Sequence, residues 1–273
     1  MKLAFVFLVA LPIFGQGMVG MSGSFGVGPD GGMRGTATFH LSPFLPPPVI
    51  NAPYSGEEVG ESSQILVDGT HITRPNMGPQ QKTWRDSQGR VRTERSLGPR
   101  RDNNTAVIVE IHDPVAGYVY VLDTVNHVAH RIHVDASPTA PPAASIRPPS
   151  APAGSGGGAG TAVATAPRLQ STQEQLGTKM IDGVLVSGVR TTTIIPEGAQ
   201  GNDRPITTTS ESWVSNQLHL PLLTVAYNPM SGTMTRKFAN FSTAEPAPSL
   251  FILPPGYTIV DETGSFTIRW GEQ

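Results

Sequence analysis

The chain has 273 residues, no cysteine and a formal net charge of −2, and charged residues make up 15% of it. The lack of cysteine excludes disulfides, thiolate metal sites, cysteine nucleophiles and the lipid anchor of bacterial lipoproteins. The weak charge excludes a nucleic-acid binder that depends on electrostatic attraction. Glycine and proline, with 30 and 26 residues, exceed ordinary usage and are concentrated in two stretches.

The N-terminus has the pattern of a secretory signal peptide over residues 1–17. Met1-Lys2 carries a positive charge, Leu3 to Phe14 is almost wholly apolar, and Gly15 and Gly17 are small residues suited to a cleavage site. The apolar run is much shorter than the roughly 20 residues that a membrane-spanning helix needs. We therefore expect an exported protein, periplasmic or extracellular, with neither a lipid anchor nor a transmembrane segment after leader removal.

Two stretches lack the patterns of strands and helices. Residues 18–53 are rich in Gly, Met, Ser and Pro, and we expect a disordered arm there. Residues 136–168 consist mainly of Pro, Ala, Gly and Ser, which cannot bury enough apolar surface to offset the entropy of ordering. We expect a disordered insertion there, between two halves of one β domain at residues 54–135 and 169–273.

The N-terminal half alternates short strands with tight turns. Asp68-Gly69 separates the runs 64–67 and 70–72, and the turn 86–89 separates the runs 82–85 and 90–94. Further strands are expected at 106–111, 118–122 and 127–134. Asp-Gly between apolar runs is a strong signal for a hairpin.

The C-terminal half repeats this pattern. Strands are expected at 175–180, 184–195, 206–214, 220–227, 233–241 and 266–270, and the best helix candidate, Leu169 to Leu176, is short. Sequential hairpins rich in β-branched residues predict an all-β fold with an antiparallel sheet. Runs such as 118–122 are apolar on both faces, so we expect the sheet to curl or to be covered on both sides. Whether the halves share one sheet is left open.

Parts of the C-terminal half resemble a known group of proteins. The stretch QEQLGTKMIDGVLVSGVRTTT at 173–193, the stretch 211–215 and the ending PAPSLFILPPGY at 246–257 look like an uncharacterised family of exported bacterial proteins. The ending is also similar to periplasmic lipoprotein-carrier (LolA-like) proteins. That resemblance implies a half-barrel around an apolar cavity that takes up acyl chains. It transfers no ligand residue, because no position matches a ligand-contacting motif.

The polar clusters offer weak signals for chemistry. His127, His130 and His133 do not converge if they lie on one strand, even if His112 joins them, so we expect no metal site. The acidic group Glu57, Glu58 and Glu61 has no fixed separation, and solvated carboxylates are the expected reading. Residues 26–31 match G-x-G-x-x-G without the strand and helix that a dinucleotide site needs. We therefore expect no cofactor.

The only cluster of basic residues in the sequence is a group of arginines at residues 85–101. Arg90 and Arg92 share one strand face and are our candidates for contact with an anionic partner. The alternative is an outward strand face that discourages edge pairing.

The sequence thus predicts a non-catalytic exported protein that binds an apolar or lipid-like ligand in the cell envelope. The alternative is a structural or protein-interaction module of the envelope without a small-molecule ligand. An enzyme is disfavoured because no catalytic constellation is present.

Overall fold

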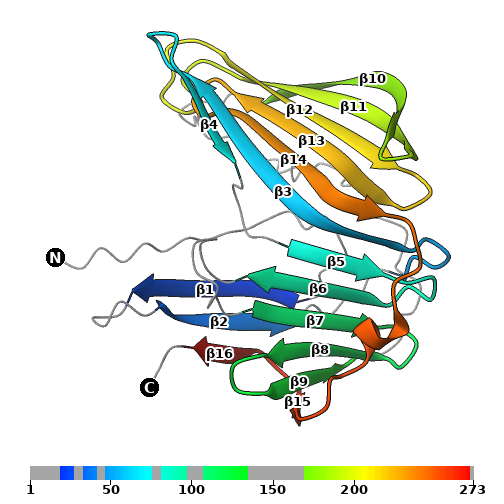
Figure 1. Ribbon diagram of the computed structural model, residues 1–273. Coiled ribbons are helices and arrows are strands. Elements are labelled where there is room, and N and C mark those ends of the chain that lie inside the picture. The colour runs from blue at the N-terminus through cyan, green and yellow to red at the C-terminus, as the bar shows by residue number, and fades with distance from the viewer. Residues whose placement is uncertain are drawn as a thin grey trace, which may run out of the picture.

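The computed structural model describes residues 19–27, 33–41, 47–75, 81–96, 107–134 and 169–270. These residues form one large, curved, unclosed sheet and a small sheet of three strands (Figure 1). The predicted all-β fold with a curved antiparallel sheet is confirmed. The expected signal peptide at 1–17 and the expected insertion at 136–168 lie outside the described residues and stay predictions.

The large sheet contains 13 strands from both halves of the chain. The N-terminal half supplies β3 (Tyr54–Ile65), β4 (His71–Pro75), β5 (Gln81–Arg85), β6 (Val91–Ser96), β7 (Val107–Asp113), β8 (Tyr118–Asp123) and β9 (Val128–His133). The C-terminal half supplies β10 (Gln170–Ile181), β11 (Val184–Ile195), β12 (Ile206–Ser215), β13 (Leu220–Asn228), β14 (Gly232–Ser242) and β15 (Thr258–Glu262).

The strand order shows how the two halves meet. It runs β10-β11-β12-β13-β14-β3-β5-β6-β7-β8-β9-β15, and β4 pairs with β3. Antiparallel pairing of β14 with β3 joins the halves, with Arg236 opposite Gly60. One continuous sheet therefore serves both halves. We call β10 to β14 with β3 and β4 the wing, which forms the upper part of Figure 1.

Short turns with a common chemistry connect the N-terminal strands. The Asp68, Asp86 and Asp113 side chains each accept a hydrogen bond from a backbone N–H two residues further on. Gly69, Gly89 and Gly117 then provide positive φ in these turns. Asx turns with a left-handed residue close hairpins at low cost, and for this reason the turn positions were predictable.

The small sheet consists of β1 (Val19–Val27), β2 (Met33–Leu41) and β16 (Phe266–Trp270), in the order β1-β2-β16. Phe39 is fully buried, and its ring stacks on that of Phe266 with 5.1 Å between centroids. The two rings pack in one core with Ile108, Val121 and other residues of β7 to β9. The expected disordered arm over 18–53 is therefore wrong for β1 and β2, because a C-terminal strand pairs with β2 and completes this layer.

Three further elements differ from expectation. Strand β3 begins at Tyr54, whereas the expected strand covered 64–67. Residues 170–176, within the best helix candidate, belong to strand β10, since they pair with β11. Strand β15 was not predicted; it pairs with β9 in parallel. The 3-10 turn η1 (Pro248–Phe251) is the only helix of the described residues, and none of these residues forms a helix that could cross a membrane.

Candidate functional site

One face of the large sheet carries both a hollow and a row of charged side chains. In its lower part this face is the one that the small sheet covers, and we call it the inner face. Side chains alternate along a strand, and cross-strand partners share a face. Ile108 and Val121 lie on this face under Phe39. Glu110 is two residues from Ile108 on β7 and therefore lies on the same face. The register of the strand pairs from β7 to β3 places Glu58 on this face as well.

A hollow of about 340 Å³ lies on the inner face of the wing. Residues from both halves line it, since Ser62 comes from β3 and the others come from β11 to β14 and the turn between β13 and β14. Its lining combines hydroxyl groups with apolar groups, among them Ser62, Thr191, Thr193, Thr208, Ser210, Ala226, Tyr227 and Met234. None of the lining residues is charged. The hollow is therefore amphipathic and not the purely apolar cavity that the resemblance implied.

A row of alternating charges crosses the inner face from the wing into the lower part of the sheet. Its members are Arg236 on β14, Glu58 on β3, Arg95 on β6 and Glu110 on β7. Glu58 lies between the two arginines and interacts electrostatically with both. The Arg95 guanidinium lies 3.4 Å from Glu110 Oε1. We call these four residues and His112, which shares the face of Glu110 on β7, the polar row.

The lower end of the polar row holds buried groups without hydrogen-bond partners. Glu110 is 8% exposed and His112 is 5% exposed. Within the part of the chain that the structure describes, no hydrogen bond reaches Glu110 Oε1, Arg95 Nε or either ring nitrogen of His112. An unsatisfied buried polar group costs about 1–3 kcal/mol. Such groups are rare and call for an explanation.

Burial alters the acid–base behaviour of these groups. Desolvation lowers the pKa of His112 to about 4, so its ring is neutral at neutral pH. Desolvation also raises the pKa values of Glu110 and Glu58 above their ordinary range, although the neighbouring arginines oppose this effect. The polar row therefore contains two guanidinium groups but carboxyl groups that resist ionisation.

Replacing His112 by phenylalanine should make the free energy of unfolding fall less steeply as the pH is lowered. Between pH 6.5 and about 4 the unfolded chain binds a proton on His112 that the folded chain does not. The free energy of unfolding should fall on acidification through this window, with a His112 contribution of up to about 3 kcal/mol. The variant His112→Phe should lack this contribution, as urea unfolding across the same pH range would measure.

Glu110→Gln is the matched variant of opposite sign. Because burial raises the pKa of Glu110, the folded chain keeps a proton that the unfolded carboxylate has released. This difference favours the folded state as pH falls. Glu110→Gln should therefore steepen the loss of stability in acid. Identical acid limbs in the parent and both variants would contradict the burial of these two groups.

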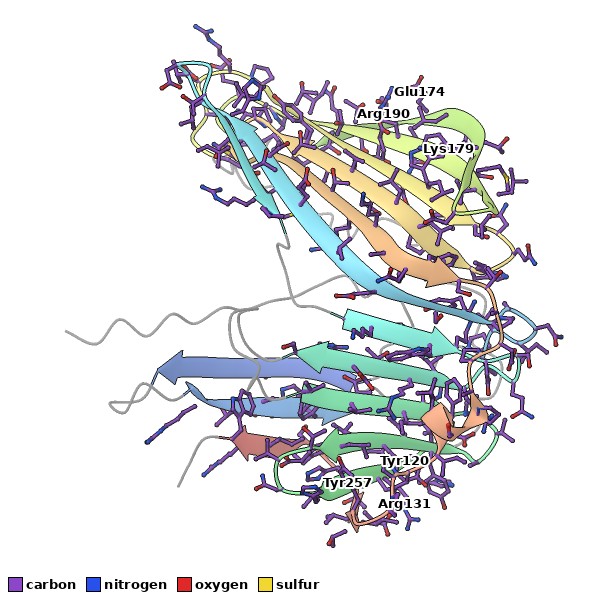
Figure 2. All side chains as sticks on the ribbon, in the orientation of Figure 1. Tyr120, Arg131, Glu174, Lys179, Arg190 and Tyr257 are labelled. Carbon is purple, nitrogen blue, oxygen red and sulfur yellow. The ribbon has the colours of Figure 1, made fainter. Side chains whose placement is uncertain are left out.

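The opposite, outer face of the wing is held by ion pairs. Arg190 on β11 donates to Glu211 Oε1 on β12 at 2.8 Å and to Glu174 Oε2 on β10 at 3.0 Å. The Lys179 ammonium lies 3.7 Å from the ring centroid of Trp213. Figure 2 shows Glu174, Lys179 and Arg190 together on β10 and β11. These contacts tie the edge strand β10 to its neighbours.

Arg90 and Arg92, the predicted contacts for an anionic partner, both make contacts within the chain. Arg90 Nε lies 2.6 Å from Asp86 Oδ2, and its guanidinium stacks over Phe251. Arg92 pairs with Glu94 at 2.8 Å and donates to the carbonyl oxygen of Leu250. Both side chains thus hold η1 against β6. Binding of an anionic partner at Arg90 and Arg92 stays a prediction.

The four histidines of the predicted cluster lie in different surroundings. His127 occupies a turn with φ of 55° beside Tyr257. His130 Nδ1 lies 2.7 Å from Glu262 Oε1, and its ring stacks on Phe266. His133 is exposed next to Tyr118, and His112 is buried. In the described ranges no group of three His, Cys, Asp or Glu residues could hold a metal ion.

The acidic group on β3 is divided between the two faces of the sheet. Glu58 is half-buried on the inner face, whereas Glu57 and Glu61 take the other side by alternation. The glycine-rich match at 26–31 begins in β1, and residues 28–31 lie outside the described ranges.

The polar row was not predicted from the sequence. Glu110 and His112 are separated by one residue within an apolar run, and this spacing places both on one buried face of a strand. This spacing could have predicted a pair of buried polar side chains on β7. Arg236 comes close to Glu58, and Arg95 comes close to Glu110, only because strands from distant segments pair. No local sequence pattern reveals this pairing.

Comparison with known proteins gives distant likenesses among solved structures. No family model matches the sequence, and no curated protein matches it. An uncharacterised conserved protein from Thermus thermophilus is 11% identical, with 77% of this chain and 91% of that chain covered and a TM-score of 0.36. LprF from Mycobacterium bovis is 13% identical, with 72% and 90% covered and a TM-score of 0.25.

A putative outer membrane lipoprotein-sorting protein domain from Vibrio parahaemolyticus is 9% identical, with 73% of this chain and 89% of that chain covered and a TM-score of 0.24. The likeness of this chain to these solved structures is therefore distant.

Proposed function

We propose that this chain is a non-catalytic binding protein of the cell envelope that holds an amphipathic, lipid-like ligand on the inner face of its wing. The hollow of about 340 Å³ is the observation that carries this proposal. Its volume lies at the lower end of the range for small-molecule sites, which run from about 300 to 1,000 Å³. The hollow would therefore hold part of a lipid-like ligand, and the rest of the ligand would lie on the neighbouring surface of the sheet.

The lining favours an amphiphile over a purely apolar molecule. Threonine presents a methyl group and a hydroxyl group, and Thr191, Thr193 and Thr208 bring both kinds of group to the hollow. Ala226 and Met234 add apolar surface to its lining. Methionine adapts its shape to varied apolar partners. A chain with polar substituents would find both kinds of contact there.

Filling the hollow should weaken binding. Ala226 lines it from β13, so the indole of Ala226→Trp would occupy the space. We expect Ala226→Trp to weaken the uptake of a fluorescently labelled long-chain alcohol at least about tenfold, which corresponds to 1.4 kcal/mol. Fluorescence titration of the purified chain measures this affinity, and native mass spectrometry of protein from its own host would show a co-purified lipid.

The neighbouring position supplies the matched control. Val225 precedes Ala226 on β13 and by alternation points to the outer face, so Val225→Trp should leave the affinity within about twofold of the parent. The proposal would be wrong if the parent chain took up no labelled alcohol or fatty acid and carried no lipid. Equal loss of affinity in both variants would also count against the hollow as the site.

A second candidate function is an envelope protein-interaction module, and the exposure of β10 favours it. All but two of the residues of this 12-residue strand are exposed. Among the described strands only β11 pairs with it. An exposed edge strand can accept a further strand from another chain. Proximity labelling in the host that finds a stable protein partner, with no lipid bound, would support this function over ligand binding.

A further inference from the structure

The polar row and the hollow lie on the same face of one continuous sheet. Met234, which lines the hollow, and Arg236, the first member of the row, are two residues apart on β14 and therefore share a face. A strand rises about 3.3 Å per residue and neighbouring strands lie about 4.8 Å apart. From Ser62 in the hollow to Arg95 the path along the sheet is therefore roughly 16 Å. An extended amphiphile could reach from one to the other.

The unpartnered atoms of the row need a hydrogen-bonding group that the described chain does not supply. Arg95 Nε is a donor, and one ring nitrogen of the neutral His112 is also a donor. Glu110 Oε1 is a further unpartnered atom, and burial raises the pKa of this carboxyl group, which favours its protonated, donating form. These donors come from the adjacent strands β6 and β7 and share the inner face. Together they suit an acceptor with several oxygen atoms.

The charge balance favours an anion as that acceptor. Arg95 and Arg236 are on either side of Glu58, so two guanidinium groups share one half-buried carboxyl group. The remaining carboxyl group of the row, that of Glu110, lies 3.4 Å from Arg95 without a hydrogen bond to it. Guanidinium groups form strong, often bidentate hydrogen bonds with carboxylates and phosphates.

We infer that Arg95, together with Glu110 and His112, binds the anionic head group, carboxylate or phosphate, of an amphiphile whose chain lies in the hollow. This inference rests on the proposed function and specifies the class of its ligand. Arg95 is the anchor, since its guanidinium combines a full charge with an unpartnered donor. Arg236 also interacts with Glu58, so Arg95 shares that carboxyl group with a second guanidinium.

The test compares three ligands with the same chain: oleate, oleyl phosphate and oleyl alcohol. The parent chain should bind at least one of the two anions about tenfold or more tightly than the alcohol, as measured by displacement of a fluorescent probe. Whichever anion binds more tightly identifies the head group. Arg95→Gln should weaken that anion about tenfold and leave oleyl alcohol within about twofold.

Three further variants separate recognition from folding. Glu110→Ala removes a proposed hydrogen-bond donor and should weaken binding of the preferred anion. Arg95→Lys keeps the positive charge and should recover part of the anion affinity that Arg95→Gln loses. Arg190→Gln removes a guanidinium from the outer face and should change neither affinity. Binding of oleyl alcohol by Arg95→Gln also shows that this variant is folded. If Arg95→Gln loses the alcohol as well, a fourth variant, Arg95→Met, takes its place in the test. A folded Arg95→Met chain that binds the alcohol and still prefers the anion as strongly as the parent overturns the inference.

The outcomes distinguish the inference from the proposed function. Equal binding of all three ligands by the parent, or unchanged anion binding by Arg95→Gln, overturns the inference and leaves the hollow as the site. Binding of none of the three overturns both.

Discussion

Replacing Phe39 by alanine should destabilise the chain by about 3–5 kcal/mol, the usual cost of truncating a buried phenylalanine. Phe39 is fully buried on β2 and stacks on Phe266. Its truncation would leave a void between the small sheet and β7 to β9, where Ile108 and Val121 lose a partner. Chemical denaturation followed by tryptophan fluorescence measures this loss, because Trp270 lies in the same core.

A graded control makes the Phe39 result interpretable. Phe39→Leu keeps most of the apolar volume and should cost about 1–1.5 kcal/mol. The order of stability should then be parent, Phe39→Leu, Phe39→Ala. A loss below about 1 kcal/mol in Phe39→Ala would contradict the packing of the small sheet on the large one. It would also restore the expectation of a disordered N-terminal arm.

Replacing Gly232 by alanine should destabilise the chain by roughly 3–5 kcal/mol, because two penalties combine. Gly232 begins β14 with φ of 84°, a region that alanine adopts only with strain. A Cβ atom there would also collide with the backbone carbonyl oxygen of Ser63 on β3. The clash falls where β14 pairs with β3, which is the joint between the two halves of the sheet.

Gly69 provides the matched control for Gly232. Its φ is 82°, but a methyl group added there would have no atom within 4 Å beyond its chain neighbours, so Gly69→Ala meets only the conformational penalty. That penalty is about 1–2 kcal/mol. Thermal unfolding of both variants should therefore separate them clearly. Equal destabilisation of the two variants would mean that β14 and β3 do not approach as closely as described.

Local chemistry made the hairpins predictable. Asp68, Asp86 and Asp113 start turns that Gly69, Gly89 and Gly117 complete, and each of these features is a property of a few adjacent residues. β-branched runs between such turns then account for most of the antiparallel strands. The all-β class followed from these signals alone.

Pairing between distant segments was not predictable in the same way. β2 joins β16, and β14 joins β3, across separations that no window of the sequence spans. Polar strands such as β10 carry little apolar periodicity, and for this reason residues 169–176 resembled a helix. The register of such strands depends on the neighbour and not on the strand itself.

The sequence by itself determined the secondary-structure class, the turns and the absence of any cysteine chemistry, because these depend on residue type and local geometry. Only the tertiary structure decided that both halves share one sheet, that an N-terminal strand pair covers its lower part, and that Arg95 meets Glu110 beside His112. The reason is that alternation along a strand assigns side chains to a face, whereas the burial of that face depends on strands that are distant in sequence.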